Sequence, residues 1–269
     1  MTQEPPPLLR VQKLSKQYRI PTWFAGRPSI EAIREIDLEV ATGTTLAIVG
    51  ESGSGKSTLA RCIAGLERAD SGAVWFEQTE ITRLGEDGLR PLRSQIQLIL
   101  QHSAGALNPR FTAGEAIDEP LLLQARATAN DRSEKVARAL KEVGLAPEWG
   151  ARRVLQFSGG QRQRLSIARA LVLQPRLLIL DEALTGLDLS IQAQILDLLL
   201  RLQREHALTY LFISHDLEVV GKIAHEIAVM YRGRMVERAS AMQLLRSPQH
   251  EYTKSLLSAQ ALLSGALPA

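Results

Sequence analysis

Residues 50–57 constrain the fold more than any other part of this sequence. They read Gly-Glu-Ser-Gly-Ser-Gly-Lys-Ser, which fits the pattern G-x-x-x-x-G-K-[ST] of a phosphate-binding loop. An apolar stretch at residues 45–49 precedes the segment, and a helix-compatible stretch at residues 57–66 follows it. The pattern also arises by chance in flexible loops, but a strand before it and a helix after it make that alternative much weaker. The sequence therefore predicts a strand, a loop and a helix within one α/β domain.

The residue types of this loop suit a polyphosphate ligand. Its glycines allow tight turns that point backbone N–H groups at phosphate oxygens, and the start of the helix adds a partial positive charge. Lys56 is expected on the β- and γ-phosphates, and Ser57 on a Mg²⁺ ion. The residues expected to contact the ligand are Gly50, Glu51, Ser52, Gly53, Ser54, Gly55, Lys56, Ser57 and Thr58.

Composition excludes several other classes of protein. The 269 residues, 45% of them hydrophobic, are enough for one large α/β domain or two small ones. The single cysteine, Cys62, is interpreted as a small buried hydrophobic residue, and it leaves no disulfide framework, cysteine-based zinc site or iron–sulfur cluster. No signal peptide or membrane-spanning run is recognised, so a cytoplasmic location is expected. A net charge of +3, scattered basic residues and 4% aromatics do not favour nucleic-acid binding.

Hydrophobic patterning divides the chain into regions. Residues 9–40 alternate apolar and polar side chains, as half-buried antiparallel strands do, with a loop at 20–29. Strands are expected at 72–76 and 96–101, and helical spacing dominates 102–173. The short apolar runs at 177–180 and 209–213 are typical of buried parallel strands, with a helix at 190–205 between them. A hairpin at 227–236 and a helical tail at 239–260, broken at Pro248, complete the prediction.

Two further segments carry candidate chemistry. Asp181 and Glu182 follow a buried strand, where open α/β sheets place ligands. Beside a phosphate loop, Asp181 can hold Mg²⁺ and Glu182 can orient or deprotonate an attacking water, whereas alone the pair would be a solvated acidic turn. A second glycine cluster opens a helix and offers another place for an anion, although Ser158 alone would be an ordinary helix cap. This cluster consists of Ser158, Gly159, Gly160 and Gln161.

The phosphate loop, Ser-Gly-Gly-Gln and Leu-Leu-Ile-Leu-Asp-Glu, in this order and spacing, resemble the ATP-binding cassette family. The resemblance implies a P-loop NTPase (RecA-like) core at 1–101 and 174–236 with an antiparallel β subdomain. It also implies an inserted α-helical subdomain at 102–173 and a helical tail at 237–269. In that family two ATPase subunits sandwich ATP, so Ser158, Gly159 and Gly160 would touch the γ-phosphate held by the partner.

The same resemblance assigns roles to single residues. Tyr18 matches the aromatic that stacks on adenine, a contact worth roughly 1–3 kcal/mol by analogy with base stacking, although a packed strand residue is the alternative. Gln101 matches the glutamine that senses Mg²⁺ and the attacking water, His215 matches the switch histidine on the γ-phosphate, and Asp188 lies in the loop after the Asp-Glu pair. Phe157, where relatives usually have leucine, is a departure that removes no functional group.

Segments around residues 101–121 and 247–257 look like the importer branch for oligopeptides, dipeptides and nickel. The tail lacks the cysteine-rich cluster of many members, which favours a heterodimer with a paralogous ATPase over a homodimer. The resemblance further implies transmembrane permease subunits, an extracytoplasmic solute-binding protein, and a peripheral position on the cytoplasmic face of the inner membrane. Two alternatives remain open: an ATPase of a non-transport assembly of the phosphonate-breakdown type, and a nucleotide-gated scaffold.

Overall fold

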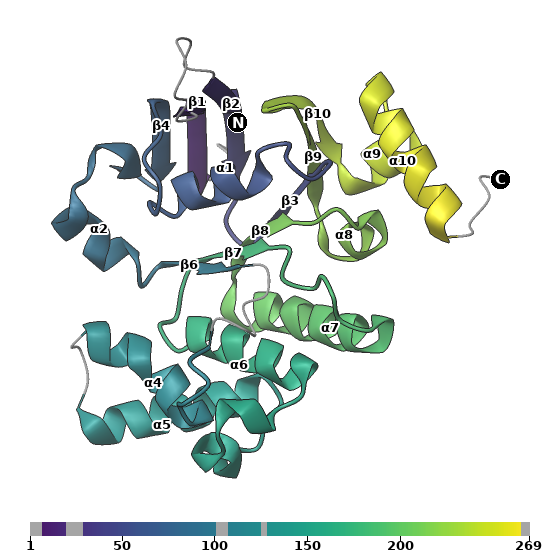
Figure 1. Ribbon diagram of the computed structural model, residues 1–269. Helices are drawn as coiled ribbons and strands as arrows, with labels where there is room; N and C mark the ends of the chain where they lie inside the picture. Colours follow the sequence, from purple (N-terminus) through teal and green to yellow (C-terminus); the bar gives the residue numbers. More distant parts are fainter. Residues whose placement is uncertain (1–6, 20–28, 101–106, 125–127, 265–269) are drawn as a thin grey trace, which may run out of the picture. The chain divides into compact units, whose positions relative to one another are not determined.

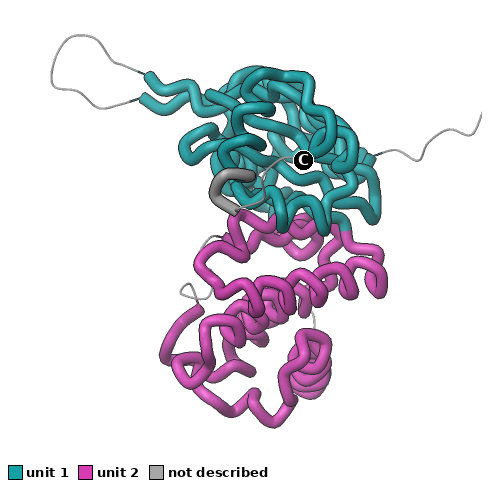
Figure 2. The backbone as a smooth tube through the Cα atoms, turned by 90° about the vertical axis from the view of Figure 1, so that its right-hand side faces the viewer, with its two compact units in different colours: residues 1–89, 209–269 teal, residues 90–208 magenta. Residues whose placement is uncertain are grey.

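The computed structural model describes residues 7–19, 29–100, 107–124 and 128–264. The chain forms two compact units, which Figure 2 colours separately. Unit 1 comprises residues 1–89 and 209–269, and unit 2 comprises residues 90–208.

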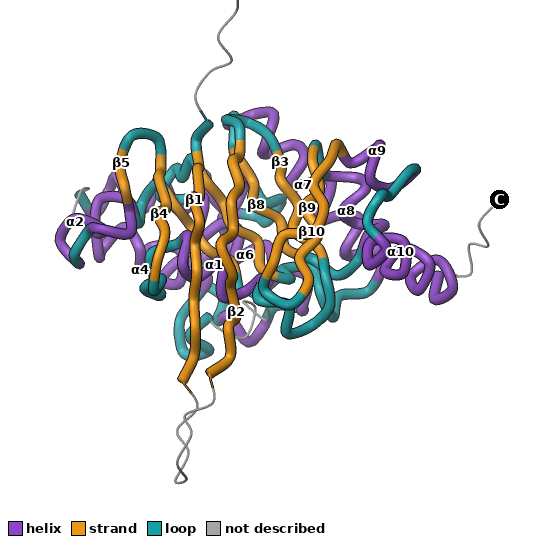
Figure 3. Tube along the Cα trace, turned by 90° about the horizontal axis from the view of Figure 1, so that it is seen from above, coloured by secondary structure: helices purple, strands orange, loops and turns teal. Residues whose placement is uncertain are grey.

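The described part of unit 1 contains an antiparallel sheet and a largely parallel group of strands. The antiparallel sheet has the order β2 (Ser29–Val40), β1 (Leu9–Arg19), β4 (Ser71–Phe76) and β5 (Thr79–Glu80), and Figure 3 shows β1 and β2 running side by side. The second group has the order β10 (Arg234–Ser240), β9 (Glu226–Tyr231), β3 (Thr45–Val49) and β8 (Thr209–Ile213). Strand β3 is parallel to both β8 and β9, whereas β10 is antiparallel to β9.

The two kinds of strand differ in burial as their sequences predict. Every residue of β3 and of β8 is buried, which suits continuous apolar runs covered on both faces. Strand β1 instead alternates buried and more exposed positions at its start, as expected for a sheet with one covered face. The predicted half-buried and fully buried strands are therefore both confirmed.

The helices of unit 1 pack on these strands (Figure 1). Helix α1 (Lys56–Ile63) contacts β2, and α8 (Leu217–Ile223) contacts β3. Helix α9 (Ala241–Arg246) contacts β9 and β10, and α10 (Glu251–Ser264) follows it. A 3₁₀ turn at Ile81–Arg83 precedes α2 (Glu86–Leu92), which crosses into unit 2.

Unit 2 combines a pair of parallel strands with a cluster of helices. Strand β6 (Ile96–Ile99) pairs with β7 (Leu177–Asp181), and α6 (Gly159–Leu171) packs against β6. Helices α4 (Ala113–Gln124) and α5 (Ala129–Glu142) pack on each other and on α6, which also contacts α7 (Leu189–His206). Short 3₁₀ turns lie at Pro147–Ala151 and Val154–Gln156.

The predicted fold class is confirmed, with some corrections. The helical tail does not start at residue 239, because residues 239 and 240 still pair in β10; the predicted break at Pro248 is correct. Helices α2 and α8 were not predicted, since each has only seven residues and none of those in α2 is buried. The chain passes from one compact unit to the other at residues 89/90 and 208/209, because β6 and β7 pair with each other and α6 packs on β6 within unit 2. The predicted subdomain limits stay a prediction.

Candidate functional site

The predicted phosphate loop lies between β3 and α1, as the motif requires. Gly55 is the N-cap residue of α1 in a left-handed conformation (φ 105°), and its carbonyl oxygen accepts from the N–H of Leu59 at 2.9 Å. Helix α1 then begins at Lys56, so its first N–H groups point back into the loop. The arrangement is that of a helix N-terminus prepared for an anion.

Two glycines of this loop are demanded by packing as well as by conformation. A Cβ atom on Gly50 would lie 2.1 Å from the carbonyl oxygen of Met230, and one on Gly55 would lie 2.0 Å from that of Ala32. Both residues also have positive φ angles, which L side chains rarely adopt. The loop is thus closely enclosed by the backbones of β2 and β9. The N–H of Gly233, in the turn after β9, adds a 3.0 Å hydrogen bond to the carbonyl oxygen of Ser54.

Lys56 is held by the loop that it belongs to. Its ammonium donates to the carbonyl oxygens of Gly50 at 2.8 Å and Glu51 at 2.7 Å, and the residue is only 5% exposed. A buried ammonium requires such acceptors because desolvation of a charge is costly. These contacts fix the positive charge at the mouth of the loop, where it can exchange a carbonyl partner for a phosphate oxygen.

Tyr18 lies beside the start of α1. Its hydroxyl is 3.4 Å from the Thr58 hydroxyl, and the ammonium of Lys16 lies 5.6 Å from the centroid of its ring. A hydrogen bond with Tyr18 is the main cause of a raised pKa for Arg61. The residue is 36% exposed, so it is not an ordinary core residue of β1. The structure therefore places Tyr18 beside the first turn of α1, and its contact with adenine stays a prediction.

His215 follows β8, the strand next to β3. Since β3 and β8 are parallel and the N–H of Ser214 donates to the carbonyl oxygen of Ile48 at 3.2 Å, both loops leave the same edge of the strands. The side chain of Asp216 caps α8 by accepting from the N–H groups of Glu218 and Val219 at 2.9 and 3.2 Å. We call residues 214–217 the switch loop. His215 itself is exposed.

The predicted carboxylates belong to unit 2. Asp181 ends β7 and is 3% exposed, and Glu182 follows it with a φ angle of 49°. A non-glycine residue in this left-handed region costs on the order of 1 kcal/mol or more, and such residues concentrate at functional sites. Asp188 is the N-cap residue of α7; it is exposed, and its side chain makes no capping hydrogen bond.

The second glycine cluster starts α6. Ser158 and Gln161 form a reciprocal capping box: the Ser158 hydroxyl accepts from the Gln161 N–H at 3.3 Å, and the Gln161 side chain accepts from the Ser158 N–H at 2.9 Å. A Cβ atom on Gly160 would lie 2.5 Å from Cγ2 of Ile191, whereas one on Gly159 would meet no atom within 4 Å. Among the described residues, packing therefore gives Gly159 no reason to be glycine.

The other predicted site residues differ in exposure, and one of them cannot be placed. Gln101 lies outside the described residues. Glu51, Ser52 and Gly53 are exposed on the loop, and Ser57 is half-buried. Sequence analysis did not find the backbone groups of Ala32, Met230 and Gly233 that enclose the loop. Gly233, in the turn between β9 and β10, was visible in the sequence, but a glycine there predicts only a hairpin and not a contact with the phosphate loop.

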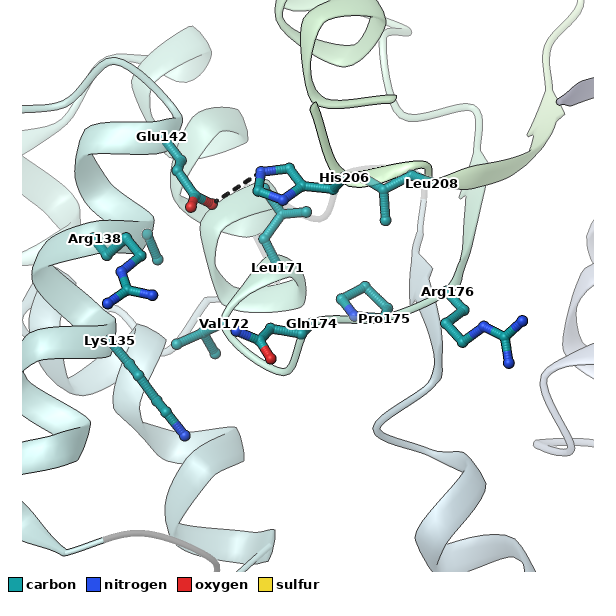
Figure 4. Close-up of a pocket in the computed structure, with 11 residues that line it drawn as sticks. Lys135, Arg138, Glu142, Leu171, Val172, Gln174, Pro175, Arg176, His206 and Leu208 are labelled. Carbon is teal, nitrogen blue, oxygen red and sulfur yellow. Dashed lines mark ion pairs between the residues drawn. The ribbon is translucent and has the colours of Figure 1, made fainter. Parts of the chain in front are cut away.

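Unit 2 also contains a cavity of about 360 Å³ (Figure 4). Lys135 and Arg138 of α5 line it, together with Arg176 and an ion pair between Glu142 and His206, whose nearest atoms are 3.7 Å apart. None of the predicted site residues lines this cavity. Its character is cationic and separate from the glycine-rich motifs.

The described residues lack two features that would point to other kinds of site. They include no group of three or more histidine, cysteine, aspartate or glutamate side chains placed to hold a metal ion. No helix in the described ranges combines the length and hydrophobicity that crossing a bilayer requires.

Comparisons with known proteins agree with the geometry. The sequence matches the family described as ABC transporter over residues 33–185. It is 46% identical to a probable peptide ABC transporter ATP-binding protein of Sinorhizobium fredii, over 94% of this chain and 72% of that protein. It is 42% identical to the di/tripeptide transport ATP-binding protein DppF of Pseudomonas aeruginosa, over 94% of this chain and 78% of the relative. The glutathione import ATP-binding protein GsiA of Escherichia coli is 43% identical, and the match spans 94% of this chain but only 41% of that protein.

Solved structures show the same relationship. The ATP-binding cassette MJ0796, dimeric and bound to ADP and Pi in a post-hydrolysis state, superposes with a TM-score of 0.77 at 28% identity, covering 87% of this chain and 98% of that one. The cbiO1 protein of Clostridium perfringens, part of the ABC transporter complex cbiONQ, gives a TM-score of 0.79 at 25% identity and covers 96% of each chain. With a phosphate loop, a capped Ser-Gly-Gly-Gln helix and relatives of this kind, the chain belongs to the ABC transporter family as an ATP-binding ATPase domain.

Proposed function

We propose that this chain is the ATP-hydrolysing subunit that energises a membrane importer for peptides or a related small solute, such as nickel. The observation that carries the proposal is the enclosed phosphate loop, in which Lys56 is 5% exposed and held by two loop carbonyls. The solute class is supported by the named relatives, which act on peptides, di- and tripeptides and glutathione.

The residues present fit a magnesium ion. Mg²⁺ prefers oxygen ligands and is usually held by one or two carboxylates together with substrate phosphates, rather than by a cage of protein groups. Ser57 offers a hydroxyl, Asp181 a buried carboxylate and Gln101 an amide oxygen. Bound there, Mg²⁺ would neutralise phosphate charge.

The chain's own groups supply the rest of the chemistry. Lys56 binds the β- and γ-phosphates, and Tyr18 stacks on the adenine. Glu182 orients or deprotonates the attacking water, with its strained backbone fixing the carboxylate after β7. His215 contacts the γ-phosphate from the switch loop. We also assign Asp188, the N-cap residue of α7, to nucleotide binding.

Dimerisation is part of the proposal. Ser158 and Gly159 are at the surface, and Gly159 faces open space, so another chain can approach this helix start closely. The likeness to a dimeric cassette supports the same idea. Here Ser158, Gly159, Gly160 and Gln161 would complete the ATP site of an identical or paralogous ATPase subunit.

The transport role adds membrane partners. We infer that permease subunits dock near residues 102–124 of the helical subdomain, next to Gln101. The tail at 237–269 would remain with the ATP-binding core. An extracytoplasmic binding protein would supply the solute, and this subunit would lie on the cytoplasmic face of the inner membrane without contacting nucleic acid.

Nucleotide binding is tested with Lys56→Ala. Loss of a charge-assisted contact is expected to weaken ATP binding about 10- to 100-fold, measured by calorimetry on a variant whose circular dichroism is unchanged. Lys141→Ala, on an exposed position of α5, is the matched control. Unchanged affinity in Lys56→Ala would contradict the assigned role.

Hydrolysis is tested with Glu182→Gln. Phosphate release should fall roughly 10²- to 10⁴-fold while ATP binding persists, because only the base is removed. Glu134→Gln, exposed on α5, serves as control.

The transport role is tested by co-purification. Tagged protein purified from membranes should bring down permease subunits; soluble enzyme subunits without a permease would exclude the importer.

A further inference from the structure

The segment before α10 is tied to β10 in unit 1. The two carboxylate oxygens of Glu237 accept from the backbone N–H groups of Gln249 at 2.8 Å and His250 at 3.0 Å. Burial alone would raise the pKa of Glu237, but hydrogen bonds, including these two, lower it below the ordinary value. Thr253, in the first turn of α10, is fully buried. Helix α10, yellow in Figure 1, therefore has a fixed starting point.

The same first turn reaches the phosphate loop. The hydroxyl oxygen of Tyr252 accepts from the N–H of Glu51 at 3.1 Å. The Tyr252 ring packs on that of Tyr231, the last residue of β9, with 4.1 Å between ring centroids. The preceding residue of β9, Met230, is the one whose carbonyl oxygen lies against Gly50. Tyr252 thus contacts both the loop and the strand that encloses it.

Two turns further on, α10 reaches the switch loop. The side-chain amide of Gln260 uses both ends: Nε2 donates to the carbonyl oxygen of His215, and Oε1 accepts from the N–H of Leu217 at 3.0 Å. Leu217 begins α8, so its N–H has no partner within that helix. One amide therefore bridges the backbone on either side of Asp216, beside the switch histidine.

We propose that α10 is a brace between the phosphate loop and the switch loop, with Tyr252 and Gln260 as positioning residues for ATP binding and hydrolysis. The two side chains are eight residues apart, which is about 12 Å along a rigid helix. Tyr252 fixes the backbone of the loop that binds phosphate, and Gln260 fixes the backbone from which His215 projects. The inference rests on the roles proposed above for the loop and for His215.

If α10 is a brace, substitutions at its two ends should change different kinetic parameters. In the full-length chain, Gln260→Ala should lower kcat roughly tenfold and change KM for ATP less than about twofold, because the backbone of the switch loop loses two hydrogen bonds. Tyr252→Phe keeps the ring and should raise KM roughly threefold with kcat unchanged. Ser258→Ala, exposed on the same helix, should match the wild type in both. A merely structural role would instead shift kcat and KM together with the melting temperature.

His215→Ala separates this inference from the proposed function. Low activity in His215→Ala with wild-type kcat in Gln260→Ala overturns the brace and leaves the ATPase assignment intact. Wild-type hydrolysis in both variants overturns the brace and the role assigned to His215, whereas absence of ATP hydrolysis in the wild type itself would overturn the ATPase assignment. If Gln260→Ala proves unstable, Gln260→Glu decides: it keeps the acceptor for the Leu217 N–H but not the donor to His215. An intermediate kcat at wild-type KM then supports the brace, and wild-type kcat refutes it.

Discussion

The two glycine-rich helix starts of this molecule are built differently. At the phosphate loop, Gly50 and Gly55 lie against the backbones of neighbouring strands, and Lys56 is buried. At the start of α6, Ser158 is exposed, and a Cβ atom added to Gly159 would have no other atom within 4 Å. The first site is enclosed by its own chain and can bind an anion by itself. The second has no described atom near the added Cβ atom, which leaves room for the second chain proposed above.

The largest effect is expected from Gly55→Ala. The new Cβ atom would lie 2.0 Å from the Ala32 carbonyl oxygen, and the φ angle of 105° disfavours any L residue. Strain and overpacking together should lower the free energy of unfolding by about 3 kcal/mol or more, measured by urea denaturation. Gly53→Ala, which shares the positive φ but meets no atom within 4 Å, is the control and should lose less. Equal losses would mean that the loop is not enclosed as described.

Gly160→Ala should have an intermediate effect. Its Cβ atom would lie 2.5 Å from Cγ2 of Ile191, a stiff β-branched side chain, so α7 must shift slightly. A loss of about 1–2 kcal/mol is expected by the same denaturation measurement. The double variant Gly160→Ala with Ile191→Val tests the cause, because removing only Cδ1 leaves Cγ2 in place and should not relieve the clash; Ile191→Ala should.

Ser158→Ala removes one half of the capping box. Loss of the bond from the Gln161 N–H should cost about 1 kcal/mol of stability. Thr128→Ala is a matched control, since Thr128 caps α5 through the same type of box with Asp131. Both variants should lose similar stability in thermal unfolding, but only Ser158→Ala should reduce phosphate release. Reduced release in both would mean that Ser158 acts through stability alone.

The smallest change in stability is expected for Gly159→Ala. Gly159 is the first residue of α6, and an added Cβ atom would contact no described atom within 4 Å. The free energy of unfolding should therefore stay within about 0.5 kcal/mol of the wild type. Phosphate release should nevertheless fall, because the added methyl group would obstruct a partner's nucleotide. A fully active Gly159→Ala variant would show that no chain approaches here.

Sequence reasoning succeeded where a local pattern carries the structure. The loop motif and the apolar runs before and after it placed β3, α1, β7 and β8, because hydrophobic burial and glycine conformations are encoded by neighbouring residues. The site assignments made by family resemblance stay predictions, and Gln101 lies outside the described residues. Contacts between distant segments were not predictable: Tyr252 meets Glu51 across 201 positions, and nothing in the sequence of the helical tail indicates which of its side chains will find a backbone partner.

Burial of the lone cysteine, which was predicted, has a practical consequence. Cys62 is 2% exposed, and burial raises the pKa of its thiol to about 12, so the thiolate is scarce at neutral pH. Maleimide reagents should therefore react very slowly with Cys62 in the native protein. A cysteine introduced at Leu189, which is 80% exposed, could carry a spin label without first deleting Cys62. Pulsed-resonance spectroscopy could then follow, through a catalytic cycle, the approach of one subunit to another.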